Sequence, residues 1–88
     1  MLINQDFTIQ KVGNSYLAVP VGETSKQFHG MVRLNETGAF LWKLMAKKDC
    51  NEAELVEALL AEYEVSREVA EQDVHSLVEL LRENRCFV

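Results

Sequence analysis

The side chains best suited to nucleophilic or metal chemistry are two cysteines and two histidines: Cys50, Cys86, His29 and His75. A zinc site needs three or four such ligands, usually with a chelating spacing such as C-x-x-C, and no two of these residues have one. One disulfide is compatible with the count, but a cytosolic chain keeps its thiols reduced. We therefore expect no metal ion and no cofactor, and we interpret all four as structural residues.

Sequence motifs of catalysis are absent. The four glycines are dispersed and form no phosphate-binding loop, and neither G-x-S-x-G nor H-E-x-x-H occurs. The 14 acidic residues fall on amphipathic segments, where carboxylates usually form a solvated face. We predict no catalytic residue, and we expect a protein that recognises another molecule rather than an enzyme.

The charge balance restricts the partners. Nine basic residues face 14 acidic ones, which gives a formal net charge of −5, and only Lys43, Lys47 and Lys48 cluster. Nucleic acid is not an expected partner, because binding a phosphate backbone requires a concentrated basic face. No apolar run approaches the roughly 20 residues that span a bilayer, and the N-terminus lacks signal-peptide features. We expect a cytoplasmic protein with no membrane segment and one domain over residues 1–88.

The first third of the chain has the pattern of β-strands. Phe7 to Gln10 alternate apolar and polar residues, and Gly13 with Asn14 predicts a tight hairpin turn. Pro20 cannot donate to a sheet, so a second strand should end, bulge or lie at an edge there. A third strand is predicted over about 28–34. The second strand places three apolar side chains on one face: Leu17, Val19 and Val21.

The rest of the chain predicts three helices. The first covers about 36–47 with Asn35 as its N-cap, since an Asn side chain accepts hydrogen bonds from the first free amides. The second opens with Asn51 and Glu54, which have the spacing of a capping box. The third runs from the Ser66 cap to about Asn84. The expected fold class is therefore α+β, a three-stranded antiparallel sheet followed by three helices.

Two features of the helices allow alternative interpretations. Trp42 lies outside the apolar stripe of the first helix, so it covers the edge of the core, packs under a strand or contacts a partner. The third helix carries more apolar surface than one core face requires, with Val69, Val78 and Leu80 beside its central stripe. Either another part of the chain or a partner covers this surplus.

These residues resemble a known family, the PqqD-like proteins. The strand-to-helix segment is similar to its signature V-x-L-N-E-x-G-A-x-x-W, and residues 20–23 resemble the Pro-Glu-Gly turn that precedes its third strand. The resemblance extends from about Phe7 to Val88, with a longer connection over 22–30. It also departs at 84–88, where the family commonly has Gly followed by two apolar residues. Seven positions match the signature: Val32, Leu34, Asn35, Glu36, Gly38, Ala39 and Trp42. The third helix is matched by Val69-Ala70-Glu71-Gln72-Asp73-Val74, Leu77, Leu80 and Leu81.

The resemblance implies a winged-helix-like peptide-recognition domain, or RiPP recognition element, of a peptide-modification pathway. Such a domain binds the leader segment of a ribosomally made precursor peptide by strand addition to the third strand, against a groove on the third helix. It then acts as a peptide chaperone for a separate enzyme, such as a radical-SAM protein or a leader peptidase. An unpaired third-strand edge also allows a homodimer. The expected peptide-binding residues are Gly30, Met31, Val32, Arg33, Leu34, Asp73, Leu77, Val78, Leu80 and Arg82.

Two other functions fit the same pattern. A winged-helix DNA-binding regulator would use the third helix for recognition, but that helix carries five carboxylates against three arginines in and directly after it, which repels phosphates. A structural accessory subunit would clamp an enzyme through Trp42 or through the surface of the third helix.

Overall fold

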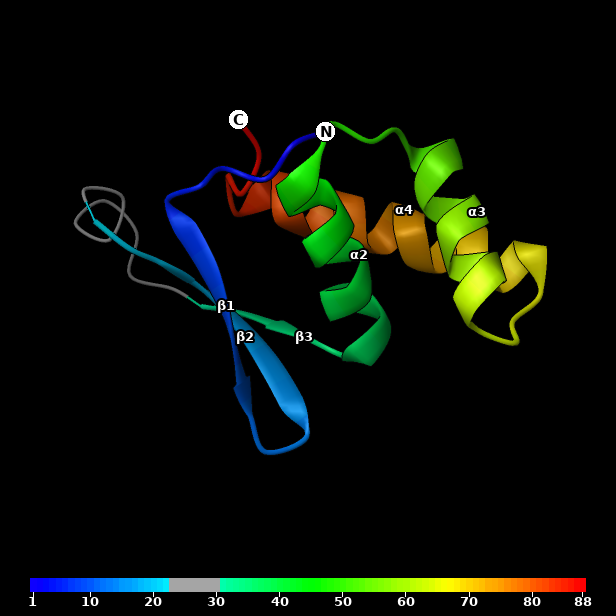
Figure 1. Ribbon diagram of the computed structural model, residues 1–88, viewed down its shortest axis with the longest axis horizontal. Helices are drawn as coiled ribbons and strands as arrows, with labels where there is room; N and C mark the ends of the chain where they lie inside the picture. Colours follow the sequence, from blue (N-terminus) through cyan, green and yellow to red (C-terminus); the bar gives the residue numbers. More distant parts are fainter. Residues whose placement is uncertain (23–30) are drawn as a thin grey trace.

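In the described part of the chain, a twisted antiparallel sheet lies on one side and the helices lie on the other (Figure 1). The computed structural model describes residues 1–22 and 31–88, and in this part of the chain the sheet precedes the helices. The predicted α+β class is therefore confirmed. The elements are β1 (Phe7–Val12), β2 (Ser15–Pro20), β3 (Val32–Leu34), α2 (Glu36–Lys47), α3 (Glu52–Glu62) and α4 (Arg67–Glu83).

The predicted hairpin is present. The strands follow the order β1-β2-β3, and Val12 faces Ser15 across a two-residue turn. Gly13 has a φ of 61°, whereas Asn14 has a negative φ, which matches a type II′ turn with glycine at its first central position. The second strand ends at Pro20, as predicted. The predicted start of the third strand at 28–30 lies outside the described residues, and its described part begins at Val32.

The most apolar face of β2 is not the face that is buried against the core. Ala18 is fully buried beside Val32 and Leu34, whereas Leu17 and Val19 are only half-buried on the outer face. The reason is the register, because Ala18 lies opposite Val32 and cross-strand neighbours point to the same side. The helix α2 contacts β2 and β3, so the small alanine lets it approach the sheet.

All three predicted N-caps are confirmed. The Oδ1 atom of Asn35 accepts the Gly38 amide at 2.8 Å, and the Ser66 hydroxyl accepts the Val69 amide at 3.2 Å. Asn51 and Glu54 form the complete capping box. Each cap satisfies amides that the helix cannot pair internally, and each helix begins at the residue after its cap.

The helix α4 ends in a left-handed residue. Arg85 has a φ of 56°, its amide donates to the Arg82 carbonyl, and the Cys86 amide donates to the Leu81 carbonyl. This pattern of two bonds is the Schellman motif, which favours glycine at the left-handed position. Here arginine occupies it, within the segment where the family resemblance places a glycine.

Trp42 belongs to the core. Its side chain is only 2% exposed, and its ring lies edge-on to Phe7 with centroids 6.4 Å apart. The interpretation that it packs under a strand is confirmed. The alternative, that it contacts a partner, is wrong because no face of the indole reaches the surface.

The N-terminal segment joins the C-terminal tail to α2. The Ile3 amide donates to the Met45 carbonyl at 3.0 Å, and Ile3 forms an isolated bridge with Phe87. Cys50 and Cys86 are buried nearby as free thiols, which fits the interpretation of them as structural residues. No helix in the described residues is long and apolar enough to cross a membrane.

We predict that Trp42→Ala lowers the free energy of unfolding by about 3–5 kcal/mol, the usual effect of truncating a buried aromatic residue. Urea denaturation measures this change. Val69→Ala on the exposed side of α4 is the control and should change stability by about 0.5 kcal/mol or less. Equal effects of the two substitutions would contradict the placement of Trp42 in the core.

A second prediction concerns alkaline pH. Burial raises the pKa of the Cys86 thiol from its ordinary 9.0 to about 11. The folded protein therefore holds this proton more tightly than the unfolded chain, so the stabilisation is complete below pH 9 and is lost as the pH approaches 11. Urea denaturation across this pH range should show the loss, and Cys86→Ala should make the slope shallower. An unchanged slope in the variant would assign the loss to other groups.

Candidate functional site

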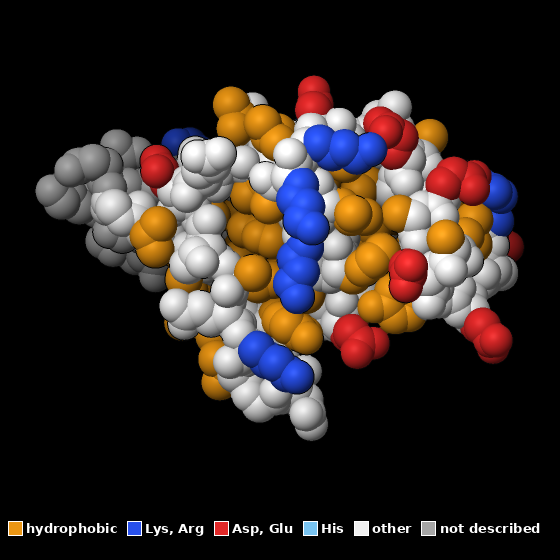
Figure 2. All heavy atoms as spheres, viewed as in Figure 1, with side chains coloured by type: hydrophobic (Ala, Val, Ile, Leu, Met, Phe, Trp, Pro, Cys, Tyr) orange, Lys and Arg blue, Asp and Glu red, His pale blue; other side chains and the backbone are white. Residues whose placement is uncertain are grey.

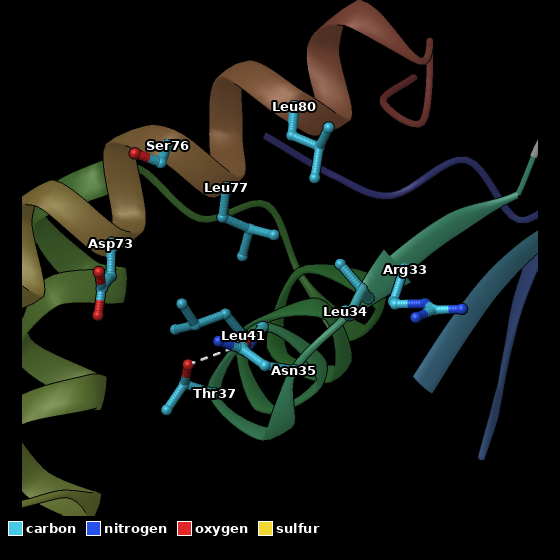
Figure 3. Close-up of a pocket in the computed structure, with 10 residues that line it drawn as sticks. Arg33, Leu34, Asn35, Thr37, Leu41, Asp73, Ser76, Leu77 and Leu80 are labelled. Carbon is cyan, nitrogen blue, oxygen red and sulfur yellow. Dashed lines mark hydrogen bonds between the residues drawn. The ribbon is translucent and has the colours of Figure 1, made fainter. Parts of the chain in front are cut away.

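A groove of about 370 Å³ opens between α4 and the corner where β3 meets α2 (Figure 3). The helix α4 supplies four of its lining residues at helical spacings of three, one and three, so they share one face. Leu77 is almost fully buried and forms part of the floor, whereas Leu80 is 39% exposed at the rim. The helix residues that line the groove are Asp73, Ser76, Leu77 and Leu80.

The opposite wall comes from β3 and the first turn of α2. Leu34 and Leu41 are buried and complete the apolar floor, and Thr37 lies at the rim. Gly38 has a specific role here, since a Cβ atom on it would lie 3.0 Å from the capping oxygen of Asn35. A larger residue at Gly38 would therefore disturb both the cap and this wall.

The backbone of β3 borders the groove. The hydrogen-bonding pattern of the β1–β2 hairpin shows which backbone groups of β3 already pair with β2. Val12 and Ser15 flank a two-residue turn and therefore form a hydrogen-bonded pair. Hydrogen-bonded pairs alternate with non-hydrogen-bonded pairs along antiparallel strands. The bond of 2.7 Å from the Val21 amide to the Asp6 carbonyl fits this alternation. The odd-numbered residues of β2 thus direct their backbone groups towards β1.

The even-numbered residues of β2 direct theirs towards β3. Tyr16 pairs with Leu34 and Ala18 with Val32, so these four residues exchange the bonds between the two strands. Arg33 lies between the two pairs, and its N–H and C=O therefore point away from β2. In the described residues β3 pairs on one side only. Among residues 1–22 and 31–88, no backbone group pairs with the outward N–H and C=O of Arg33, so the outer edge of β3 presents them as a donor and an acceptor beside the groove.

The Arg33 side chain takes no part in the floor of the groove. It points away from α4, while Leu34 points inward (Figure 3). This difference follows from the alternation of side chains along a strand. Arg33 therefore contributes through its main chain, which no pattern of side chains in the sequence reveals.

The groove brings together five of the ten residues that the sequence predicts for peptide binding. The other five lie elsewhere. Gly30 is outside the described residues, Met31 is exposed before β3, and Val32 is buried under the sheet. Val78 is fully buried in the core, and Arg82 pairs with Glu79 at 3.3 Å away from the groove lining. The five residues in the groove are Arg33, Leu34, Asp73, Leu77 and Leu80.

Sequence reasoning missed the five other lining residues: Asn35, Thr37, Gly38, Leu41 and Ser76. Ser76 follows Asp73 by three positions, and this helical spacing was the one available indication.

The lining offers an apolar floor, a free backbone edge and one carboxylate. No group of three or more potential metal ligands occurs in residues 1–22 and 31–88. This arrangement suits the binding of an extended chain.

Comparison with known proteins assigns the family. The family model for coenzyme PQQ synthesis protein D (PqqD) matches residues 20–86, which include β3 and all three helices. This chain belongs to the PqqD family. No curated protein matches the sequence significantly.

Two solved structures share the fold. One is TbiB1 in complex with the TbiA(beta) leader peptide, with 21% identity, a TM-score of 0.73, and coverage of 98% of this chain and 93% of that one. The other is lasso peptide synthetase B1 complexed with the leader peptide, with 24% identity, a TM-score of 0.67, and coverage of 93% and 89%. At these identities the likeness establishes the arrangement of sheet and helices.

Proposed function

We propose that this protein binds the leader segment of a ribosomally synthesised precursor peptide and presents it to a separate enzyme. The observation that carries the proposal is the free Arg33 backbone beside an apolar groove on α4. Strand addition uses such an edge for affinity and neighbouring pockets for specificity. Membership of the PqqD family supports the proposal, as do the leader peptides bound to the two proteins of similar fold.

The strand geometry defines how the leader would lie. One leader residue pairs with Arg33 and exchanges both hydrogen bonds with it if the added strand is antiparallel. Its side chain points to the same side as that of Arg33, away from the groove. The residues before and after it point into the groove towards Leu77 and Leu80. The preferred leader therefore carries apolar residues two positions apart.

Asp73 and Ser76 add polarity at one end of the groove. Both are exposed and lie one helical turn apart on α4. The Asp73 carboxylate accepts a hydrogen bond from a leader amide or pairs with a leader cation. Met31 stays in the proposal as an exposed neighbour of the edge, whereas the buried Val78 has no surface to offer.

The chain itself supplies binding and no catalytic step in this proposal. The receiving enzyme is a peptide-modifying protein, such as a radical-SAM protein or a leader peptidase, in the cytoplasm. An added strand from a second copy would occupy the same edge as the leader. Homodimer formation through β3 and leader binding are therefore mutually exclusive.

A proline substitution tests the strand-addition mode. Arg33→Pro removes the outward N–H without removing a bond to β2, because the amides of Val32 and Leu34 make that pairing. We expect at least about tenfold weaker binding, since the leader carbonyl opposite loses its donor. Isothermal titration with synthetic leader segments of the short precursor peptides encoded in the same genome measures the change.

The matched control is Arg33→Ala, which keeps the N–H and removes only the outward side chain. It should bind the leader almost as tightly as the unchanged protein. Circular dichroism confirms that both variants are folded. Equal affinities of the proline and alanine variants would refute strand addition at Arg33.

A second pair of variants tests the groove. Leu80 and Val69 lie on α4 with similar exposure, 39% and 43%, but only Leu80 lines the groove. Leu80→Ser should weaken leader binding by about tenfold through the loss of apolar contact, whereas Val69→Ser should leave it unchanged. The same titration measures both. A larger effect at Val69 would place the leader on another face of α4.

A further inference from the structure

A band of lysines crosses the face of the molecule that is formed by α2 and the β1–β2 hairpin (Figure 2). We define this lysine strip as Lys11, Lys43, Lys47 and Lys48, all of which are exposed. It contains four of the nine basic residues of a chain whose net charge is −5. Such a concentration contrasts with the acidic surface of the other helices.

Two of these lysines converge on one aromatic ring. Lys11 lies opposite Tyr16 across the hairpin and places its Nζ atom 5.9 Å from the ring centroid. Lys43 reaches the same ring from α2 at 5.8 Å. Cations near an aromatic face are attracted to the ring, which holds both ammonium groups in place despite their repulsion.

Three of the four strip lysines have no ion-pair partner in the described part of the chain. Lys48 pairs with Glu54 at 3.7 Å, whereas Lys11, Lys43 and Lys47 have no carboxylate within ion-pair distance among residues 1–22 and 31–88. Three ammonium groups are therefore available to an anionic partner. Their position along one face favours a partner with several carboxylates rather than a small anion.

The strip and the groove lie on different sides of α2. Leu41 lines the groove, and Lys43 follows it by two positions, which is a rotation of about 200° around the helix. A peptide in the groove therefore leaves the strip uncovered. The protein can hold a peptide on one side of α2 and contact a second molecule on the other.

The surroundings of the strip favour a protein over a nucleic acid. Phe40 on α2 and Tyr63 at the end of α3 are half-buried, with ring centroids 5.6 Å apart. The pKa of Tyr63 is raised, first by its partial burial and then by the carboxylates of Glu36 and Glu62 and by Tyr16. Carboxylates thus lie near Tyr63, where they would repel a continuous phosphate backbone. A protein surface can place acidic groups at the lysines and neutral groups elsewhere.

We propose that the lysine strip is the docking site for an acidic surface of a protein partner. This inference goes beyond peptide binding and does not depend on it. Combined with the proposed function, it assigns the strip to the enzyme that receives the peptide. The groove would then hold the substrate while the strip holds the enzyme.

A poly-glutamate peptide serves as the probe in an NMR titration of the ¹⁵N-labelled protein. We expect shifts at the four strip residues and at Tyr16, which disappear at high salt because screening weakens exposed charge pairs. Lys43→Glu should weaken poly-glutamate binding by at least about tenfold. The control, Arg67→Glu, makes the same change in net charge on α4 and should change binding by about twofold or less.

Several results would overturn the proposal. Equal losses in the two variants would show that only net charge matters. Tighter binding of a short DNA duplex to the same residues would favour a nucleic acid partner. Self-association that Lys43→Glu abolishes, measured by sedimentation, would identify a second copy of the chain as the occupant. Absence of any shift with poly-glutamate would remove the site altogether, while the leader titrations with the Arg33 and Leu80 variants test the groove separately.

Discussion

The junction at Asn35 is the constraint on which the rest of the structure depends. This single residue separates β3 from α2, and its side chain accepts the Gly38 amide at 2.8 Å. A Cβ atom on Gly38 would also lie 3.5 Å from the Leu34 side chain, so strand and helix pack closely at the corner. The cap therefore fixes the direction in which α2 leaves the sheet. The free edge of β3 and the groove both result from that direction.

Local interactions made most of the elements predictable. The caps at Asn35, Asn51 and Ser66 act over three residues, so the sequence alone located the helix starts. Which face of each strand is buried was harder to predict from the sequence. The apolar row of Leu17 and Val19 lies outside, because the buried side of β2 is decided by its register with β1 and β3, which is a tertiary property.

The same limit applies to the site. Leu77 and Val78 are consecutive apolar residues on α4, and both were predicted to bind the peptide. Only Leu77 lines the groove, because the packing of α4 against the remainder of the core turns Val78 inwards. Ser76 is polar and had no apolar periodicity to mark it. The resemblance to a known family supplied the general location, but the direction of the Arg33 backbone required the hairpin register.

The β3 backbone and the α4 side chains would contribute differently to leader selectivity. In the proposed mode, hydrogen bonds to the Arg33 backbone would be open to any extended chain, so β3 would contribute affinity with little discrimination. Discrimination would then depend on α4, where Asp73, Ser76 and Leu80 are exposed and Leu77 is buried. Exposed positions tolerate substitution with small changes in stability. The rim of α4 is therefore free to vary with the leader, while the junction that creates the groove remains constant.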